Sequence, residues 1–114
     1  MRVTLDTRDV TVPPTFKHRL TLRVAGMLSR FARSVRKLHV SLRDINGPRG
    51  GNDKVCQITI ALEGGDQIIV KEKSHRLVKA MRLAVRKAKV LLADRNRRRR
   101  SRRVTSRMLP VPAS

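Results

Sequence analysis

The strongest constraint on the fold of this chain is a charge-neutral segment with strand-like alternation at its centre. Residues 38–73 carry five basic and five acidic side chains, and apolar residues recur at every second position along most of the segment. This period is typical of half-buried β-strands. Turn-forming residues interrupt it at 45–53 (INGPRGGND) and at 64–66 (GGD). The segment therefore predicts a three-stranded meander.

Apolar residues with helical spacing lie on both sides of the meander. One stripe predicts a helix at about 14–33, with prolines tolerated at its start; it comprises Phe16, Leu20, Val24, Met27 and Phe31. The second predicts a helix that begins near Ser74, a suitable N-cap; it comprises Leu77, Met81, Ala84, Ala88 and Leu91. Residues 2–8 (RVTLDTR) alternate and predict a further strand. The order is β-α-β-β-β-α, an α+β fold.

The positive charge is confined to the flanks of the meander. The 114-residue chain has 28 Lys and Arg against 8 Asp and Glu, a net charge of +20, and its last 20 residues hold eight basic side chains and no acidic one. We expect a folded domain at 1–94 and an arginine-rich tail at 95–114 that is largely disordered beyond about residue 103. Such a charge calls for a polyanionic partner, with nucleic acid ahead of an anionic membrane.

Several classes of protein are disfavoured by the sequence. No segment has the roughly 18 to 20 apolar residues that span a bilayer, and no signal peptide is evident, so we expect a cytoplasmic protein with no membrane partner. GPRGGNDK lacks the second glycine and the Ser or Thr of a phosphate-binding P-loop. The three histidines and Cys56 show no metal-ligand spacing. We expect no enzymatic activity, metal, cofactor or small-molecule substrate.

The second predicted helix has a basic face that we interpret as a binding surface. Lys79, Arg82, Arg86 and Lys89 lie opposite its apolar stripe without interleaved carboxylates, so the usual opposite-charge pairing is missing. The chain has no Trp or Tyr, and both Phe residues belong to the first helical stripe, so few side chains are available to stack on bases. Contacts should therefore be made to phosphates, on structured RNA or on DNA without sequence preference.

Two segments resemble the ribosome hibernation promoting factor and ribosome-associated inhibitor family, also called ribosomal subunit interface or sigma-factor modulation proteins. LRDINGPRGGNDKVCQITIAL is similar to a strand, loop and strand of that family, and SHRLVKAMRLAVRKAKVLL lies where its second helix is expected. The resemblance covers about residues 1–98. It implies a four-stranded mixed sheet with both helices packed on one face, similar in outline to a double-stranded RNA-binding domain.

The resemblance also implies a function. Members bind the small ribosomal subunit, and with it the whole ribosome, in the channel for messenger and transfer RNA. They contact ribosomal RNA there and block translation in stationary phase or stress. Lys87 matches a basic position of the family, whereas Val90 and Asp94 stand where the family has basic residues. The candidate RNA-binding residues are Arg19, Arg23, Arg30, Lys79, Arg82, Arg86, Lys87, Lys89, Arg95, Arg97 and Arg98.

The arginine-rich tail keeps a second hypothesis open. Taken alone, residues 95–114 would suit a nonspecific nucleic-acid-binding protein, either a nucleoid-type DNA packer or an RNA chaperone. The two hypotheses differ in where the affinity lies. A translation silencer should bind through its folded domain, and a DNA packer should lose most of its affinity without the tail.

Overall fold

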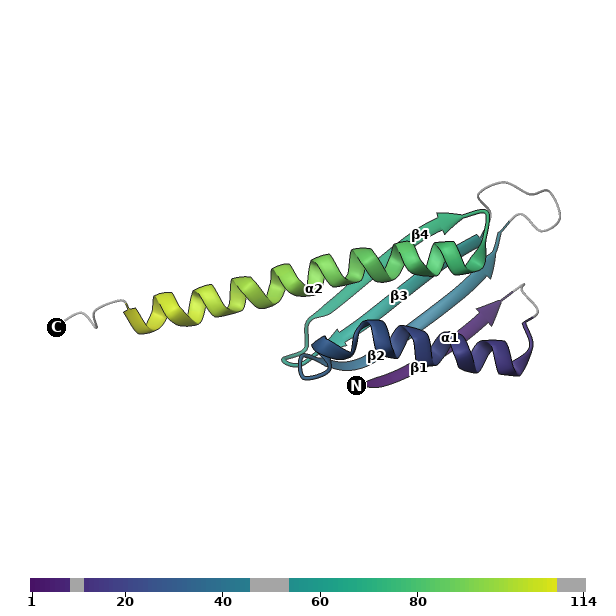
Figure 1. Ribbon diagram of the computed structural model, residues 1–114. Coiled ribbons are helices and arrows are strands. Elements are labelled where there is room, and N and C mark those ends of the chain that lie inside the picture. Colours follow the sequence, from purple (N-terminus) through teal and green to yellow (C-terminus); the bar gives the residue numbers. More distant parts are fainter. Residues whose placement is uncertain (9–11, 46–53, 109–114) are drawn as a thin grey trace.

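The fold is a four-stranded sheet with two helices, as expected from the sequence (Figure 1). The computed structural model describes residues 1–8, 12–45 and 54–108, and the side chains of these up to residue 98. In chain order the elements are β1 (Arg2–Arg8), α1 (Pro14–Met27), the 3-10 helix η1 (Ser29–Phe31), β2 (Val35–Asp44), β3 (Lys54–Leu62), β4 (Gln67–Ser74) and α2 (Leu77–Met108). The predicted α+β class and the order β-α-β-β-β-α are both confirmed.

The strands lie in the order β1-β2-β3-β4, and the sheet is mixed. β1 and β2 are parallel, whereas β2, β3 and β4 pair antiparallel as the predicted meander. Parallel neighbours need a long crossover connection, and α1 with η1 provides it here. The connection between β2 and β3, which contains the glycine-rich stretch 46–53, lies outside the described residues.

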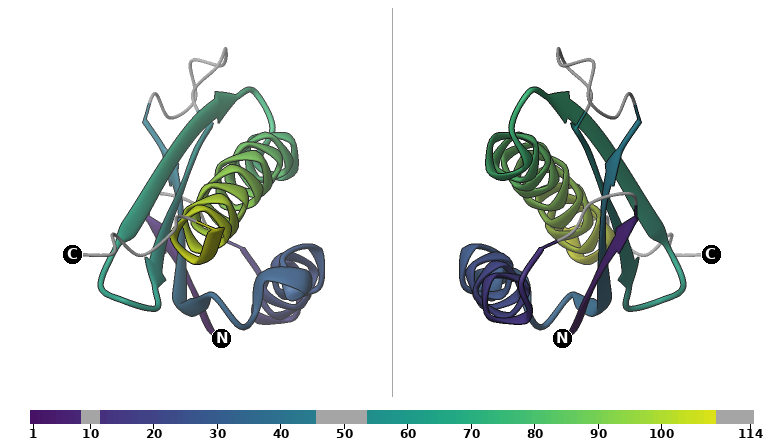
Figure 2. Two further views of the ribbon diagram at one scale, coloured as in Figure 1. Left: turned by 90° about the vertical axis from the view of Figure 1, so that its left-hand side faces the viewer. Right: turned by 90° about the vertical axis from the view of Figure 1, so that its right-hand side faces the viewer.

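Both helices cover the same face of the sheet (Figure 2). Alternation along the strands directs one set of side chains into the core between sheet and helices, and Leu38, Val40, Ile58 and Ile60 are all fully buried there. Cys56 is also fully buried in this core. Its burial raises the pKa of the thiol to about 12, which makes it a small core side chain rather than a reactive nucleophile.

The predicted end of the first helix was wrong. α1 ends at Met27 rather than at residue 33, because Leu28 leaves the helical region with φ −108° and ψ 9°. The chain then continues as η1, and both Leu28 and Phe31 remain buried against the core. Apolar spacing alone does not distinguish a continuous helix from a helix followed by a 3-10 turn, since both direct these side chains to the same side.

The predicted start of the second helix was also wrong. Ser74 is not an N-cap but the last residue of β4, where it is buried and pairs with Lys54 of β3. α2 begins at Leu77. Leu92 replaces Leu91 as the last fully buried residue of its apolar stripe, and Leu91 is 37% exposed.

α2 continues past the predicted domain boundary. The helix runs to Met108 without interruption in its backbone, so the boundary between residues 94 and 95 falls within one element. The division into a folded domain and a tail, and the disorder of the free tail beyond about residue 103, stay predictions.

The core accounts for stability through side chains such as that of Ile58. We expect Ile58→Ala, a truncation at 0% exposure, to lower the free energy of unfolding by about 2 to 5 kcal/mol. Ile69 of the adjacent strand is 60% exposed, so Ile69→Ala is the matched control and should change it by about 0.5 kcal/mol or less. Urea unfolding of both variants measures the difference, and equal effects would contradict the assignment of the core face.

Candidate nucleic-acid interface

The exposed side of α2 forms a cationic surface, which we call the α2 face and define as Lys79, Arg82 and Arg86. Opposite it, α2 buries Ala80, Met81, Ala84, Val85, Ala88 and Leu92 against the sheet. All three residues of the α2 face are exposed, and they line one open groove together with Arg76, Val78 and Leu83. Among the side chains that the structure describes, no carboxylate pairs with any of the three. These cations are therefore available to a polyanion.

Three further candidates come together between η1 and α2. Arg30, Lys89 and Arg97 line one groove, which also includes Val90 and Ala93. The guanidinium of Arg30 lies over the buried ring of Phe31, 4.6 Å from its centroid. This cation–π contact holds Arg30 at the groove. Lys89 lies on the same side of α2 as Arg82, about two turns farther along the helix, and it lines this groove rather than the groove of the α2 face.

Two candidates lie on α1. Arg19 and Arg23 are exposed and one helical turn apart, on the flank of α1 next to its buried residues Leu20 and Val24. They add positive charge to the helical side of the domain. The structure does not bring them into the α2 face.

Three candidates on α2 form ion pairs through exposed side chains: Lys87, Arg97 and Arg98. Lys87 lies on the flank of α2 toward β4, with its Nζ 3.7 Å from Oε1 of Glu72. Arg97 and Arg98 both contact Asp94, at 2.7 and 3.1 Å. The hydrogen bond from Arg97, with the nearby charge of Arg98, lowers the pKa of Asp94 below its usual value. Because these pairs are solvent-exposed, they are weak and can be exchanged for contacts with phosphate.

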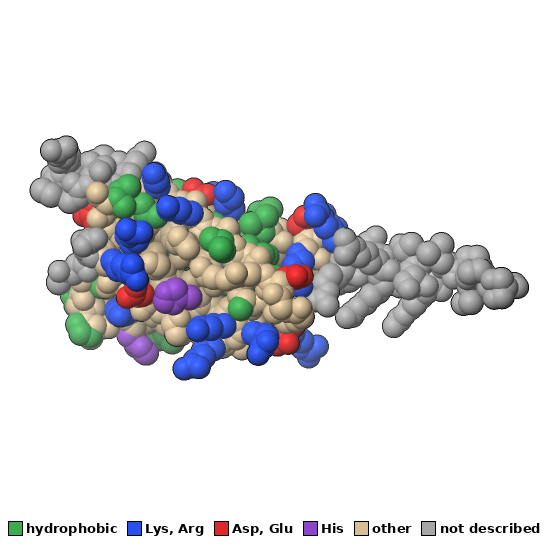
Figure 3. Space-filling view, turned by 180° about the vertical axis from the view of Figure 1, so that it is seen from behind, with side chains coloured by type: hydrophobic (Ala, Val, Ile, Leu, Met, Phe, Trp, Pro, Cys, Tyr) green, Lys and Arg blue, Asp and Glu red, His purple; other side chains and the backbone are tan. Residues whose placement is uncertain are grey.

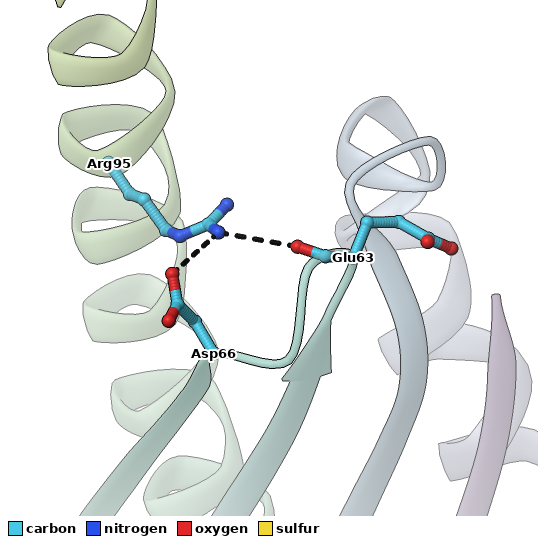
Figure 4. Close-up of polar contacts among 3 residues, drawn as sticks. All are labelled: Glu63, Asp66 and Arg95. Carbon is cyan, nitrogen blue, oxygen red and sulfur yellow. Dashed lines mark hydrogen bonds and ion pairs between the residues drawn. The ribbon is translucent and has the colours of Figure 1, made fainter.

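Arg95 has a structural contact that sequence analysis missed (Figure 4). Its Nη2 donates to Oδ2 of Asp66 at 2.9 Å and reaches the backbone oxygen of Glu63 at 3.5 Å. Only 16% of the Arg95 side chain is exposed. Both acceptors belong to the β3–β4 turn, in which Gly64 and Gly65 have φ of 92° and 95°, values that glycine adopts without strain. We call this contact the Arg95 clamp.

Asn96, the residue after Arg95, connects α2 to the segment that precedes β2. Nδ2 of Asn96 lies 3.5 Å from Oγ of Ser34, just before β2, and the backbone of Ser34 in turn accepts a hydrogen bond from the amide of Glu63 at 3.0 Å. Consecutive residues of α2 therefore contact two different connections of the sheet. These contacts fix the direction in which α2 leaves the sheet, and no local sequence signal reveals them because the partners are 29 and 62 residues away.

Two other properties bear on the class of protein. In the described part of the chain, no group of three or more His, Cys, Asp or Glu side chains could hold a metal ion. None of the described helices has the length and apolar character required to cross a membrane.

Fold and surface together define a small α+β domain with basic residues exposed on both helices. The chain belongs to the family of sigma 54 modulation proteins and S30EA ribosomal proteins, which it matches over residues 3–100. The family resemblance noted from the sequence is thereby confirmed. These are ribosome-associated modulation factors, a non-enzymatic class of protein.

Solved structures show the same fold. A ribosomal subunit interface protein from Coxiella burnetii superposes with a TM-score of 0.64 at 17% identity, covering 84% of this chain and 98% of the other. The N-terminal domain of Protein Y from Thermus thermophilus superposes with a TM-score of 0.63 at 18% identity, covering 81% and 96%. No curated protein sequence matches the chain significantly.

The Arg95 clamp predicts a specific loss of stability. We expect Asp66→Asn to lower the free energy of unfolding by about 1 kcal/mol, since it weakens a charged hydrogen bond whose acceptor is largely exposed. Glu63→Gln is the matched control: it removes the same charge three residues away, but only the backbone oxygen of Glu63 contacts Arg95. Urea unfolding compares the two variants. Equal losses would mean that net charge, not the clamp, is responsible.

Proposed function

We propose that this protein silences translation by binding ribosomal RNA of the small subunit in the channel for messenger and transfer RNA. Two findings support the proposal. The chain belongs to a family of ribosome-associated modulation factors. Within that fold, Lys79, Arg82 and Arg86 form an exposed surface without carboxylate partners among the described side chains. The α2 face is the observation that carries the proposal.

The mechanism is occlusion. Lys and Arg side chains contact phosphates by charge-assisted hydrogen bonds, and phosphate contacts set the position of a protein on a nucleic acid without reading its sequence. The sheet holds α2 rigidly through its buried stripe, so the three cations reach the RNA as a preformed set. The protein then occupies space that messenger and transfer RNA require, and no covalent bond is made or broken.

Val90 and Asp94, which stand where the family has basic residues, are consistent with RNA contacts that are shifted to neighbouring positions. Val90 is 63% exposed and carries no charge, and the charge of Asp94 is offset by Arg97 and Arg98. Lys89 and Arg30, in the neighbouring groove, supply positive charge at the same level of α2. Arg95 is occupied by the clamp and is the one candidate that we assign to positioning rather than to RNA.

Binding to the ribosomal channel also determines where and when the protein acts. A protein that occupies the channel competes with translation, so it acts in the cytoplasm and is useful when growth stops, in stationary phase or stress. The whole ribosome is a partner as well as the free small subunit.

The binding mode predicts a steep dependence on salt. About six phosphate contacts would give a slope of about −4 to −5 for the logarithm of the ribosome binding constant against the logarithm of salt concentration. Binding to purified small subunits, measured by sedimentation at several salt concentrations, gives the slope. A slope near zero would contradict a phosphate-contact mechanism.

A charge-matched pair of variants separates the proposed function from nonspecific binding by the tail. The variant Lys79→Gln, Arg82→Gln, Arg86→Gln removes three phosphate contacts, so we expect inhibition of a translation extract to weaken at least about tenfold and the salt slope of ribosome binding to flatten by about 2 to 3. The control Arg100→Gln, Arg102→Gln, Arg103→Gln removes three charges from the tail and should inhibit nearly as well as the parent.

The reverse pattern would overturn the proposed function. If the tail variant loses inhibition and ribosome binding while the α2-face variant keeps both, the protein binds nucleic acid nonspecifically through its arginine-rich end. Both variants change only surface or terminal residues, so an unchanged thermal transition verifies that they are folded.

A further inference from the structure

The face of the sheet that the helices leave uncovered carries its own cationic surface. Strand register places four rows of side chains across it. The first row is Arg2, Lys37, Ala61 and Gln67; the second Thr4, His39, Thr59 and Ile69; the third Asp6, Ser41, Gln57 and Lys71; the fourth Arg8, Arg43, Val55 and Lys73. Lys and Arg gather in two groups on this face (Figure 3). We call it the open face.

The arrangement of charge on the open face works against folding. Six Lys and Arg side chains share it with one carboxylate, Asp6, which lies 3.5 Å from Arg8. At both ends of the β1–β2 ladder two cations are direct neighbours: Arg2 opposite Lys37, and Arg8 opposite Arg43. Like charges in directly opposite positions destabilise a sheet. Among the described side chains, the other five cations of this face have no ion-pair partner.

The centre of the open face suits a phosphate backbone. The two middle rows hold mainly uncharged polar side chains, together with Ile69, Asp6 and Lys71. Thr4 Oγ1 is 2.7 Å from His39 Nδ1 there. Hydroxyl and amide groups of this kind contact the sugars and phosphates of nucleic acids. None of the side chains in the four rows is Phe, Tyr or Trp, so His39 is the one ring among them that could stack on a base. The lack of these larger aromatic residues also disfavours a protein interface, whose centres are enriched in them.

We propose that the open face is a second RNA-binding surface, so that one domain contacts two RNA segments on its opposite sides. The occupant is RNA bound through its phosphates and sugars, and charge complementarity is the reason for this choice. That this RNA is ribosomal rests on the proposed function. The proposal that the open face binds RNA does not depend on it. An RNA segment on this side offsets the repulsion between neighbouring cations that the free sheet must tolerate.

A photo-crosslinker tests the proposal on the ribosome. A benzophenone amino acid replaces Ile69, which is 60% exposed on the open face, or Val90, which is 63% exposed on α2, in the full-length chain. With purified small subunits, both positions should crosslink to ribosomal RNA. If the probe at position 69 labels only protein, or nothing, while that at position 90 labels RNA, the open face is not an RNA surface and the proposed function still stands.

A second experiment decides the matter without the ribosome. In Arg43→Gln, Lys73→Gln two phosphate contacts are lost, so affinity for a double-stranded RNA probe should fall about tenfold and the salt slope should flatten by about 2. The control, Lys17→Gln, Arg33→Gln, removes two charges outside the open face and should change the slope by less than half as much. Equal effects of the two pairs would overturn the proposal. If the parent does not sediment with ribosomes, the proposed function fails and this comparison still tests the surface.

Discussion

The rest of the structure depends on the burial of one face of a mixed sheet beneath two helices. A chain with a net charge of +20 repels itself, and the compact state must offset that repulsion with apolar contacts. The sheet provides them: side chains such as Leu38, Ile58 and Ile60 have no exposed surface, and α1 and α2 cover them from the same side. Packing of this core fixes the positions of the basic side chains on the surface of the domain.

The positions of the acidic residues explain which basic residues of α2 have no ion-pair partner among the described side chains. Glu72, Asp66 and Asp94 each contact a basic residue of α2, namely Lys87, Arg95, and Arg97 with Arg98. All of these pairs lie on the flank of the helix toward β4 or in its later turns. No described carboxylate lies against the α2 face. Glu72 and Asp66 thus link α2 to the sheet, whereas Asp94 pairs with arginines of α2 itself. The cations of the α2 face are left without a competing carboxylate among the described side chains.

Periodicity predicted the elements whose signals are local. Alternation in residues 38–73 gave the meander, helical spacing gave both helices, and the order of elements followed. Predictions of element ends failed where the same residues suit two local structures. The turn after Leu28 continues the apolar stripe of a helix. Ser74 is as acceptable at the end of a strand as at an N-cap.

The candidate site also has a part that local sequence patterns predicted and a part that they did not. The exposure of Lys79, Arg82 and Arg86 follows from helical phase, so it was predictable. The convergence of Arg30 with Lys89, and the occupation of Arg95 by the β3–β4 turn, depend on how distant segments pack. A single sequence contains no local signal for such contacts. The roles of the eleven candidates in RNA binding stay predictions.

The most direct test of the central claim is an electron cryo-microscopy reconstruction of the small subunit with the full-length protein bound. The account predicts density for the domain in the messenger and transfer RNA channel, with Lys79, Arg82 and Arg86 at hydrogen-bonding distance, about 3 Å, from ribosomal RNA phosphates. Density for the domain elsewhere on the subunit, or an α2 face directed into solvent, would contradict it.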